Sequence, residues 1–538
     1  MVDTYKRATR NIGLTRSDGM RSANGGAVFK ADDMVTLKRM LILGTDKGSF
    51  YESAEQLTTK FINQVNRCLA TYGADVVELV RDVSSGGLSM SNDHALLALA
   101  VAASYGLTEV VEDTGAEHIR YAALNALPDV ARTGTHLLHF VEYVSGLRGW
   151  GTVLRREVAR WYTTGSDSVE RSPLAIAKQV TKYASRDGWS HADVLRLTHP
   201  TVDNPEIDGI FNYVVNDRDI SKVPVGAVQE YLMAVNLAKD ENTPKETVID
   251  LIHTYHLPRE VINTTFLGDA DVWAALLPGM PIHALLRNLG TLTRQGVIST
   301  WSDGERVAVN KLVAPSNGLL HPLEVLKAQR QYASGQGYRS GESWKPSQQV
   351  VKKLEQLFYD SFGTIMPTGQ RLYVAIDVSH SMSRATVLEG LSAAEVASVL
   401  AMAVIRTEPF VHVAGFATNL IDLPITPTMS LDEVTRLTKS RLGENTYCSA
   451  PIADARLRGL DVDAFIMYTD GQTSDRTSVG SVIRDYRRGT SAAGRLVVNQ
   501  MQANNVSLVE TNDPLFLNLV GTSSTTPQII SEFVRGQF

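Results

Sequence analysis

The chain has 538 residues, of which 43% are hydrophobic and 20% are charged, the composition of an ordinary water-soluble protein. This length predicts roughly three or four domain-sized units, unless a helical repeat array extends one of them. The formal net charge of −6 argues against the strongly basic domain that indiscriminate nucleic-acid binding uses. Any contact with nucleic acid must therefore come from local clusters of Lys and Arg.

The cysteine content and the apolar runs indicate the compartment. Cys68 and Cys448 are the two cysteines of the chain, so a disulfide framework is excluded and a reducing environment is expected. The longest strongly apolar run, around His94 to Tyr105, is too short to span a bilayer. No apolar stretch follows the first ten residues, so we expect no secretory signal. The expectation is a cytoplasmic protein without a membrane partner.

From about residue 30 to residue 360, apolar side chains recur every three or four positions, which predicts amphipathic helices. We expect on the order of fourteen helices, with lengths and turns typical of helix-pair repeats. The apolar stripes include Leu57, Phe61, Val65 and Leu69; Trp150, Leu154, Val158 and Trp161; and Ile282, Leu285, Leu286 and Leu289.

A boundary near residue 365 separates this region from a different pattern. The small-residue segments Ser334–Gly337 and Pro367–Gly369 mark the change. Beyond them, strands alternate with helices, which favours a doubly wound parallel sheet. The expected strands are 372–376, 410–416, 464–468 and 496–500, and the expected helices are 391–405, 431–438, 479–487 and 527–534.

Oxygen-bearing side chains gather where two of these strands end. Asp377, Ser379 and Ser381 alternate directly after the first strand, Asp470 follows a later strand, and Thr446 lies in a loop between them. Ligands of an open α/β sheet collect at the carboxyl ends of its strands, and hard oxygens in this number suit Mg²⁺ or a similar cation. The set resembles the metal-ion-dependent adhesion site of von Willebrand factor A domains. We expect no catalysis there, because neither a paired base and nucleophile nor a phosphate-binding loop of the Walker type is evident.

Two basic clusters stand out in the helical region. Lys178, Lys182 and Arg186 are spaced four apart, so on a continuous helix they project from one face and can follow phosphates. The second cluster lies opposite the stripe that begins at Trp150 and consists of Arg148, Arg155, Arg156 and Arg160. The alternative for each cluster is a solvated helix face.

Several segments resemble Ro proteins, the TROVE-domain family, over nearly the whole chain. The most specific are Lys182–His199 and Val272–Gly290. Further matches are Leu37–Gly44 with the aromatic pair Phe50-Tyr51, Thr135-His136-Leu137, and the Pro-Thr-Gly segment that leads into the metal motif.

This resemblance implies a fold and a function. The fold is a monomeric ring of HEAT-like helical repeats, closed by a von Willebrand factor A-like domain. Ro proteins bind Y RNA on the outer surface of the ring and single-stranded 3′ ends of misfolded structured RNA in the central hole. Bacterial members act with a 3′-to-5′ exoribonuclease through Y RNA. On the family pattern, Lys182, Arg186 and His199 match residues that contact Y RNA. Tyr447 departs from the pattern, since many relatives carry an acidic residue there.

We therefore expect residues 1–24 to be an unassigned segment, 25–362 to form the RNA-binding ring and 368–538 to form the von Willebrand factor A-like domain. The expected function is that of a non-catalytic RNA-binding protein in RNA quality control. The first alternative is a protein-interaction adaptor that binds an acidic partner through the metal, with the helices as scaffold. The second is an RNA-processing enzyme.

Overall fold

The computed structural model describes residues 20–21, 27–28, 33–43, 54–86, 92–107, 115–313, 320, 322–337, 341–365, 367–384, 386–388, 391–440, 445–501, 508, 513, 515–520 and 526–536. Most of the expected N-terminal segment, and Gly44 and the pair Phe50-Tyr51, lie outside these ranges. Within the described ranges, no helix has both the length and the apolar character that crossing a membrane requires.

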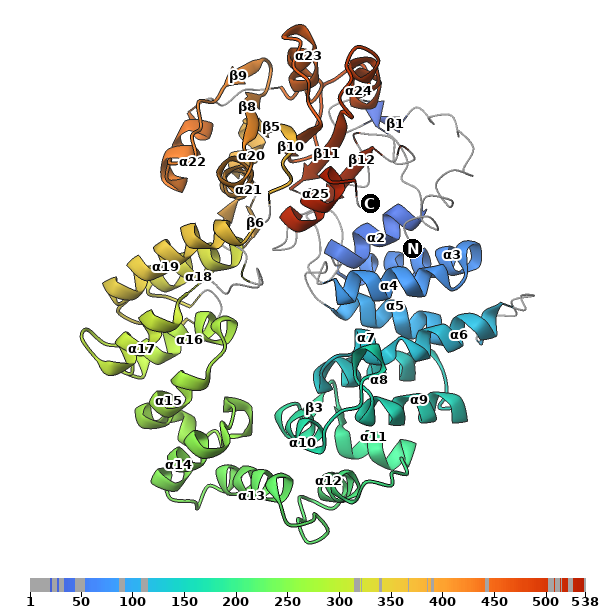
Figure 1. Ribbon diagram of the computed structural model, residues 1–538, viewed down its shortest axis with the longest axis vertical. Helices are drawn as coiled ribbons and strands as arrows, with labels where there is room; N and C mark the ends of the chain where they lie inside the picture. The colour runs from blue at the N-terminus through green and yellow to red at the C-terminus, as the bar shows by residue number, and fades with distance from the viewer. Residues whose placement is uncertain are drawn as a thin grey trace.

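Figure 1 shows the helices following one another along a ring-like course, with a sheet-containing domain between the first and the last of them. The ring expected from the sequence is therefore confirmed, with more helices than the fourteen expected. They are α2 Asp33–Leu43, α3 Ala54–Tyr72, α4 Asp75–Ser85, α5 Asp93–Ser104, α6 Ala116–Asn125, α7 Leu127–Val130, α8 Gly134–Leu147, α9 Thr152–Thr163, α10 Pro173–Lys182, α11 His191–Thr198, α12 Pro205–Val215, α13 Ala227–Lys239, α14 Lys245–Tyr255, α15 Ala270–Leu276, α16 Ile282–Arg294, α17 Asp303–Lys311, α18 Pro322–Ser334 and α19 Gln348–Asp360.

Apolar stripes hold the array together, as the periodicity predicts. Leu154, Val158 and Trp161 of α9 are buried, and so are Leu285 and Leu289 of α16. Helix α5 is apolar on nearly every side and packs against α3, α4, α6 and α8, as expected of a helix enclosed by its neighbours.

The second domain is a six-stranded sheet with helices on both faces. Its strand order is β12-β11-β10-β5-β8-β9, and the pairs are parallel except for β8 with β9. The strands are β5 Arg371–Asp377, β8 Phe410–Phe416, β9 Leu420–Asp422, β10 Ala464–Thr469, β11 Arg495–Gln500 and β12 Phe516–Val520. The helices are α20 His380–Arg384, α21 Ala393–Thr407, α22 Leu431–Lys439, α23 Ala450–Leu457, α24 Val479–Arg488 and α25 Thr526–Val534.

Strand β5 lies inside the sheet, and its side chains pack alternately on the two faces. Leu372, Val374 and Ile376 join the core that includes α21, whereas Tyr373 and Ala375 join a second core with residues of α23 and α24. A strand buried on both faces has a continuous run of apolar residues in its sequence, which is why β5 is well predicted from the sequence. The helix expected at 391–405 begins later, at Ala393, because residues 391–392 form the short strand β7 and Ser392 caps the helix.

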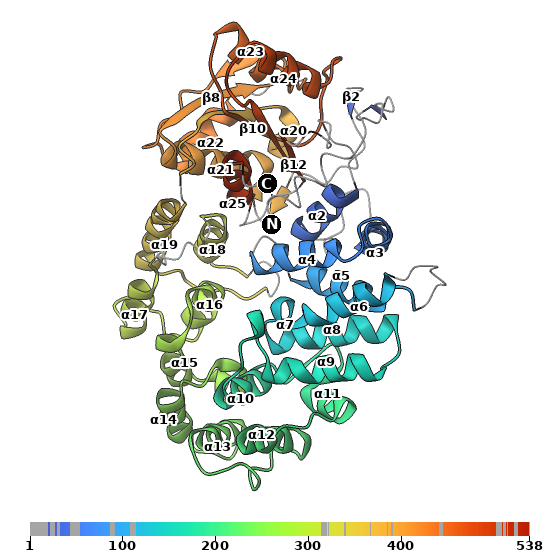
Figure 2. The same ribbon diagram turned by 45° about the vertical axis from the view of Figure 1, so that its right-hand side comes forward.

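The two ends of the helical array meet the sheet domain. Helix α2 contacts β12, and α18 contacts α21. Figure 2 shows α2 and α4 beside the C-terminal helix α25, and the Lys38 ammonium of α2 interacts electrostatically with Glu532 of α25 and Asp82 of α4. The burial of Lys38 nevertheless lowers its pKa to about 8.

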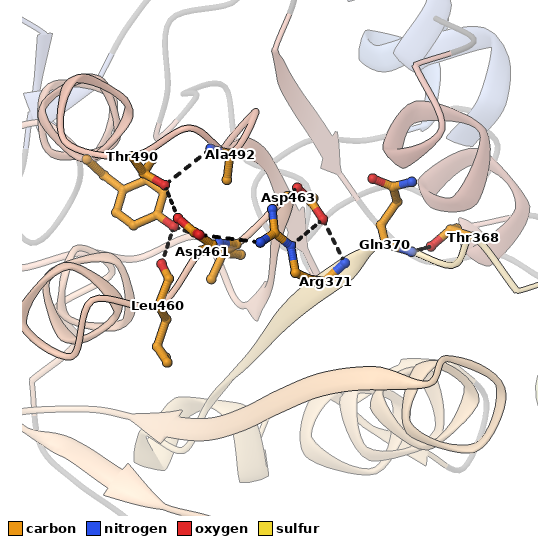
Figure 3. Close-up of polar contacts among 10 residues, drawn as sticks. Thr368, Gln370, Arg371, Leu460, Asp461, Asp463, Thr490 and Ala492 are labelled. Atoms are coloured by element: carbon orange, nitrogen blue, oxygen red, sulfur yellow. Dashed lines mark hydrogen bonds and ion pairs between the residues drawn. The ribbon is translucent and has the colours of Figure 1, made fainter.

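Polar contacts fix the point where the chain enters β5 (Figure 3). The Arg371 guanidinium donates to both carboxylate oxygens of Asp463, at 2.9 and 2.8 Å, and lies 3.5 Å from Asp461. The backbone N–H groups of Thr368 and Gly369 donate to Glu408 at 2.6 and 3.0 Å. This edge of the sheet is opposite the end of β5 that carries Asp377.

Candidate functional site

The two carboxylates of the expected metal motif lie at the ends of neighbouring strands. Asp377 ends β5, and Asp470 directly follows β10, which pairs with β5 in parallel. The Asp377 carboxylate accepts from the Ser379 N–H at 2.8 Å and from the Thr469 hydroxyl at 2.7 Å. The Ser379 and Ser381 hydroxyl oxygens are 3.0 Å apart. The alternating loop therefore folds its oxygens toward one another.

Thr446 is buried and is held against the loop after β10. Its carbonyl oxygen accepts from the Ser474 N–H at 2.7 Å and from the Thr473 hydroxyl at 3.4 Å. Asp475 ties the two loops together, because its carboxylate accepts from the Thr473 hydroxyl at 2.8 Å and from the Ser449 N–H at 3.0 Å. All five residues expected from the sequence thus lie at the same edge of the sheet, with Asp377 at the end of β5, Ser381 in α20 and the other three in loops.

Two buried carboxylates so close together are an unfavourable pair without a cation. Asp377 is 1% exposed and Asp470 3% exposed. Burial, and then the charge of Asp470, raise the pKa of Asp377 to about 7. The described residues contain no group of three or more His, Cys, Asp and Glu side chains that could hold a metal ion. The site after β5 has only two carboxylates, but it adds the hydroxyls of Ser379, Ser381 and Thr446. These are oxygen ligands of the kind that Mg²⁺ takes, with water completing the shell, so the residues present fit a hard cation.

Sequence reasoning missed two contributors to this edge, Thr469 and Asp475. Thr469 binds the Asp377 carboxylate directly, and its position at the end of the strand beside β5 is the signal that points to it. Asp475 carries no such signal, since its partners Thr473 and Ser449 are recognisable only from the folded loops.

The first basic cluster is built differently from the expectation. Lys178 and Lys182 lie one turn apart on α10, but the helix ends at Lys182. Arg186 belongs to the hairpin of β3 (Ser185–Arg186) and β4 (Trp189–Ser190), so the expected single helical face that includes Arg186 is wrong. The cause is the turn at Asp187-Gly188, whose φ values are +53° and +83°, the signature of a tight hairpin turn.

The hairpin is anchored to α8 and presents Arg186 to solvent. The Trp189 indole N–H donates to Glu142 at 2.9 Å, and the Asp187 carboxylate contacts the His139 ring. The Arg186 guanidinium is 56% exposed and lies 3.6 Å from Asp187. Arg186 is therefore held at a defined place without being sequestered.

His199 caps the C-terminal end of α11 and is exposed. Its backbone is left-handed, with φ +46° and ψ +58°, and its N–H donates to the Leu195 carbonyl at 2.9 Å. Lys178 is exposed and Lys182 half-buried, with their ammonium groups 5.8 Å from the Tyr231 ring and 5.2 Å from the Tyr183 ring. Such contacts orient a cation but leave it able to bind an anion.

Arg155, Arg156 and Arg160 of the second basic cluster lie on α9, opposite the buried stripe, as expected. Arg148 does not, because it directly follows α8, where its guanidinium donates to the Ala103 carbonyl at 2.6 Å. Arg156 and Arg160 both form ion pairs with Glu157, at 2.9 and 2.8 Å, and Glu157 is only 7% exposed. Arg155 is exposed, and its side chain has no hydrogen bond or ion pair with any other described residue. Much of the charge of this cluster is therefore neutralised locally, whereas that of the first is not.

Comparison with known proteins identifies the family. The family model of the TROVE domain matches residues 20–259, and that of the Ro60 vWA domain matches residues 371–534. A protein of Deinococcus radiodurans named RNA-binding protein RO60 is 34% identical over 96% of this chain and 96% of its own length. A Caenorhabditis elegans protein of the same name is 28% identical over 99% of this chain and 92% of its own length.

The solved structures agree with the sequence comparison. The crystal structure of the Deinococcus radiodurans RO (RSR) protein superposes with a TM-score of 0.77 and 32% identity, covering 94% of this chain and all of that one. With a relative at this level of identity along almost the entire chain, and with the ring and the sheet domain both matched, the chain belongs to the Ro60 family.

Proposed function

We propose that this chain is a non-catalytic RNA-binding protein that binds a Y RNA through α10, the β3–β4 hairpin and the end of α11. The observation that carries the proposal is that the basic side chains there are oriented, accessible to solvent and little paired with carboxylates. Lys178, Lys182 and Arg186 are oriented by aromatic or hairpin contacts and keep solvent access, with a single carboxylate, Asp187, within ion-pair distance of any of them. This holds for the described residues, and phosphate-directed Lys and Arg provide most of the affinity for structured RNA.

The proposed cellular role is RNA quality control in the cytoplasm. Single-stranded 3′ ends of misfolded RNA would enter the centre of the ring, and a 3′-to-5′ exoribonuclease partner would be recruited through the Y RNA. The support for this role is membership of the Ro60 family, whose relatives are named for RNA binding.

The proposed cofactor is Mg²⁺, held by Asp377, Ser379, Ser381, Thr446 and Asp470. When bound, the ion would neutralise the two buried carboxylates and leave a coordination position for an acidic group of a partner. This supports the second candidate function, a metal-dependent adaptor on a helical scaffold. The two functions are compatible, because the metal motif and the basic surface lie in different domains.

Sequencing of the RNA that co-purifies with the full chain tests the RNA proposal first. Binding of the enriched small RNA is then measured for Lys182→Ala with Arg186→Ala. Removal of about two phosphate contacts should flatten the slope of log K against log salt by roughly one to two units. Affinity should fall by about 1–3 kcal/mol for each charged hydrogen bond lost.

A matched control is Lys345→Ala with Lys352→Ala, which removes two exposed lysines, one just before α19 and one within it. Figure 1 shows α19 on the other side of the ring from α10. Lys245 is a poor control, because its ammonium pairs with Asp269 and Asp271 at 3.2 and 2.8 Å. Unchanged affinity and unchanged salt slope in a folded Lys182/Arg186 variant would contradict the proposal. Co-purification of an acidic protein and no RNA would favour the adaptor.

A further inference from the structure

A pocket of about 600 Å³ lies where the helical array meets the sheet domain. Arg330 of α18 lines one side, Glu395 of α21 another, and α22 provides most of the remainder. None of the residues of the metal motif or of the basic surface on α10 and the hairpin lines it. Every residue that lines it has a charged or polar side chain, which favours a polar ligand.

Helix α22 directs one of its faces into this pocket. Asp432, Thr435, Arg436 and Lys439 line it, and their spacing of three, four and seven residues puts them on one side of the helix. The other side holds the buried residues Leu431, Val434 and Thr438. Packing of the apolar side against the domain therefore fixes the direction of the polar side.

The acidic groups of the pocket already have partners. Asp432 lies 3.4 Å from the Arg330 guanidinium. The Glu395 carboxylate accepts from the N–H and the hydroxyl of Ser392, at 2.9 and 2.8 Å, in the capping box of α21. The Asp432 carboxylate thus pairs with Arg330, whereas the Glu395 carboxylate caps α21 and interacts electrostatically with Lys439 and Arg330.

Two of the basic groups interact with carboxylates only at longer range, Lys439 with Glu395 and Arg436 with Glu433. Arg436 and Lys439 are exposed, and across the described ranges neither side chain has a hydrogen bond or an ion pair within 4.0 Å. The pocket therefore offers two cationic donors on adjacent turns of one helix, beside a third, Arg330, that shares its charge with Asp432.

Thr435 adds an independent observation. The residue is 9% exposed, its hydroxyl oxygen is almost inaccessible to solvent, and within the described part of the chain that hydroxyl has no hydrogen-bond partner. A buried hydroxyl without a partner is unfavourable, and such groups in native proteins call for an explanation. The residue lines the pocket between Asp432 and Arg436, so a turn of its side chain toward the pocket would let a ligand oxygen satisfy the hydroxyl.

We propose that this pocket binds a phosphoryl group, carried by an RNA terminus or by a free nucleotide. Arg436 and Lys439 would neutralise its charge, with the Arg436 guanidinium suited to two of its oxygens, and the Thr435 hydroxyl, once its side chain turns toward the pocket, would donate to a third. A metal cation is excluded as the occupant by the three basic side chains. Because Arg330 comes from the array and α22 from the sheet domain, the ligand would contact both.

The test measures binding of three probes to the full chain: a 5′-phosphorylated tetranucleotide, the same RNA with a 5′-hydroxyl, and AMP. The phosphorylated RNA or AMP should bind, and Arg436→Gln with Lys439→Gln should weaken that binding about tenfold or more, as expected for lost charged hydrogen bonds. Binding of the phosphorylated RNA alone identifies an RNA terminus as the source, and equal binding of AMP identifies a free nucleotide. Arg456→Gln, an exposed site on α23, serves as the control and should change nothing.

A second pair of variants separates ligand binding from folding. Thr435→Val removes the hydroxyl at nearly constant volume and should weaken binding without lowering the melting temperature, whereas Thr435→Ser should retain binding. The proposal is overturned if neither phosphorylated probe binds, if the 5′-hydroxyl RNA binds as well as the phosphorylated one, or if the Arg436/Lys439 variant binds like the wild type. These outcomes are independent of Y RNA binding, which the Lys182 and Arg186 substitutions report.

Discussion

Asp377→Asn tests the proposed metal centre sharply, because it removes one of two buried carboxylates and keeps the shape of the side chain. The amide oxygen can still accept from the Ser379 N–H, and the Thr469 hydroxyl can rotate to accept from the amide. The repulsion between the Asp377 and Asp470 carboxylates disappears. In the absence of metal, the variant should therefore be more stable than the wild type.

The size of the gain follows from the pKa of Asp377, which burial and Asp470 raise from 3.8 to about 7. A shift of about three units at about 1.4 kcal/mol per unit corresponds to about 4 kcal/mol. Between pH 3.8 and about 7 the folded state holds a proton that the unfolded state has released. The metal-free wild type is therefore most stable, with respect to this group, below pH 3.8, loses stability as pH rises, and carries the full penalty above pH 7.

The assay is differential scanning calorimetry at pH 8, in EDTA and in excess Mg²⁺. In EDTA the sheet domain of Asp377→Asn should melt above that of the wild type, and Mg²⁺ should raise the melting temperature of the wild type alone. Asp475→Asn is the control, because that buried carboxylate accepts hydrogen bonds from Thr473 and Ser449 and its loss should lower stability. A lower melting temperature for Asp377→Asn in EDTA, or a Mg²⁺ response equal to that of the wild type, would refute the reasoning.

Three further expectations concern catalysis and the helical array. Purified protein with Mg²⁺ should leave labelled RNA intact on a gel, and cleavage lost in Asp470→Ala would contradict this. Burial lowers the pKa of His191 to about 4, so folding stability should fall by about 3 kcal/mol between pH 6.5 and 4, a loss that His191→Gln should reduce in acid denaturation. Trp301 is 84% exposed with φ +67°, so Trp301→Gly should relieve backbone strain and stabilise by about 0.5–1 kcal/mol in urea titrations.

Much of the sheet domain could be predicted because its central strands are buried on both faces. The strands expected at 410–416 and 464–468 agree with β8 and β10 within one residue. The peripheral elements β9, β12 and α23 were missed, since short or edge elements bury less and carry weaker patterns. Asp377 and Asp470 were found for the same reason as the strands, because the end of a buried strand is visible in the sequence.

The error at Arg186 has a different cause. A spacing of four residues places Lys182 and Arg186 together only if the helix continues through both. The Asp187-Gly188 turn was recognisable, but the sequence did not show that its hairpin begins at Ser185. The hairpin is in addition docked on α8 through Trp189 and Glu142, a contact between residues far apart in the chain that the local sequence does not reveal.

Which of the two basic clusters binds RNA depends on whether acidic side chains already neutralise their charges. The number of Lys and Arg residues in each cluster does not show this. Glu157 lies on the buried stripe of α9, three residues after Leu154 and four before Trp161, and the two arginines beside it neutralise its carboxylate. Arg156→Ala should therefore lower thermal stability, because it takes one partner from a buried carboxylate, and should change RNA affinity little. Arg155→Ala should leave stability unchanged, since its side chain is exposed. If Arg156→Ala instead weakened RNA binding as strongly as Lys182→Ala with Arg186→Ala and left melting unchanged, α9 would be the principal RNA surface and the assignment to α10 and the hairpin would be wrong.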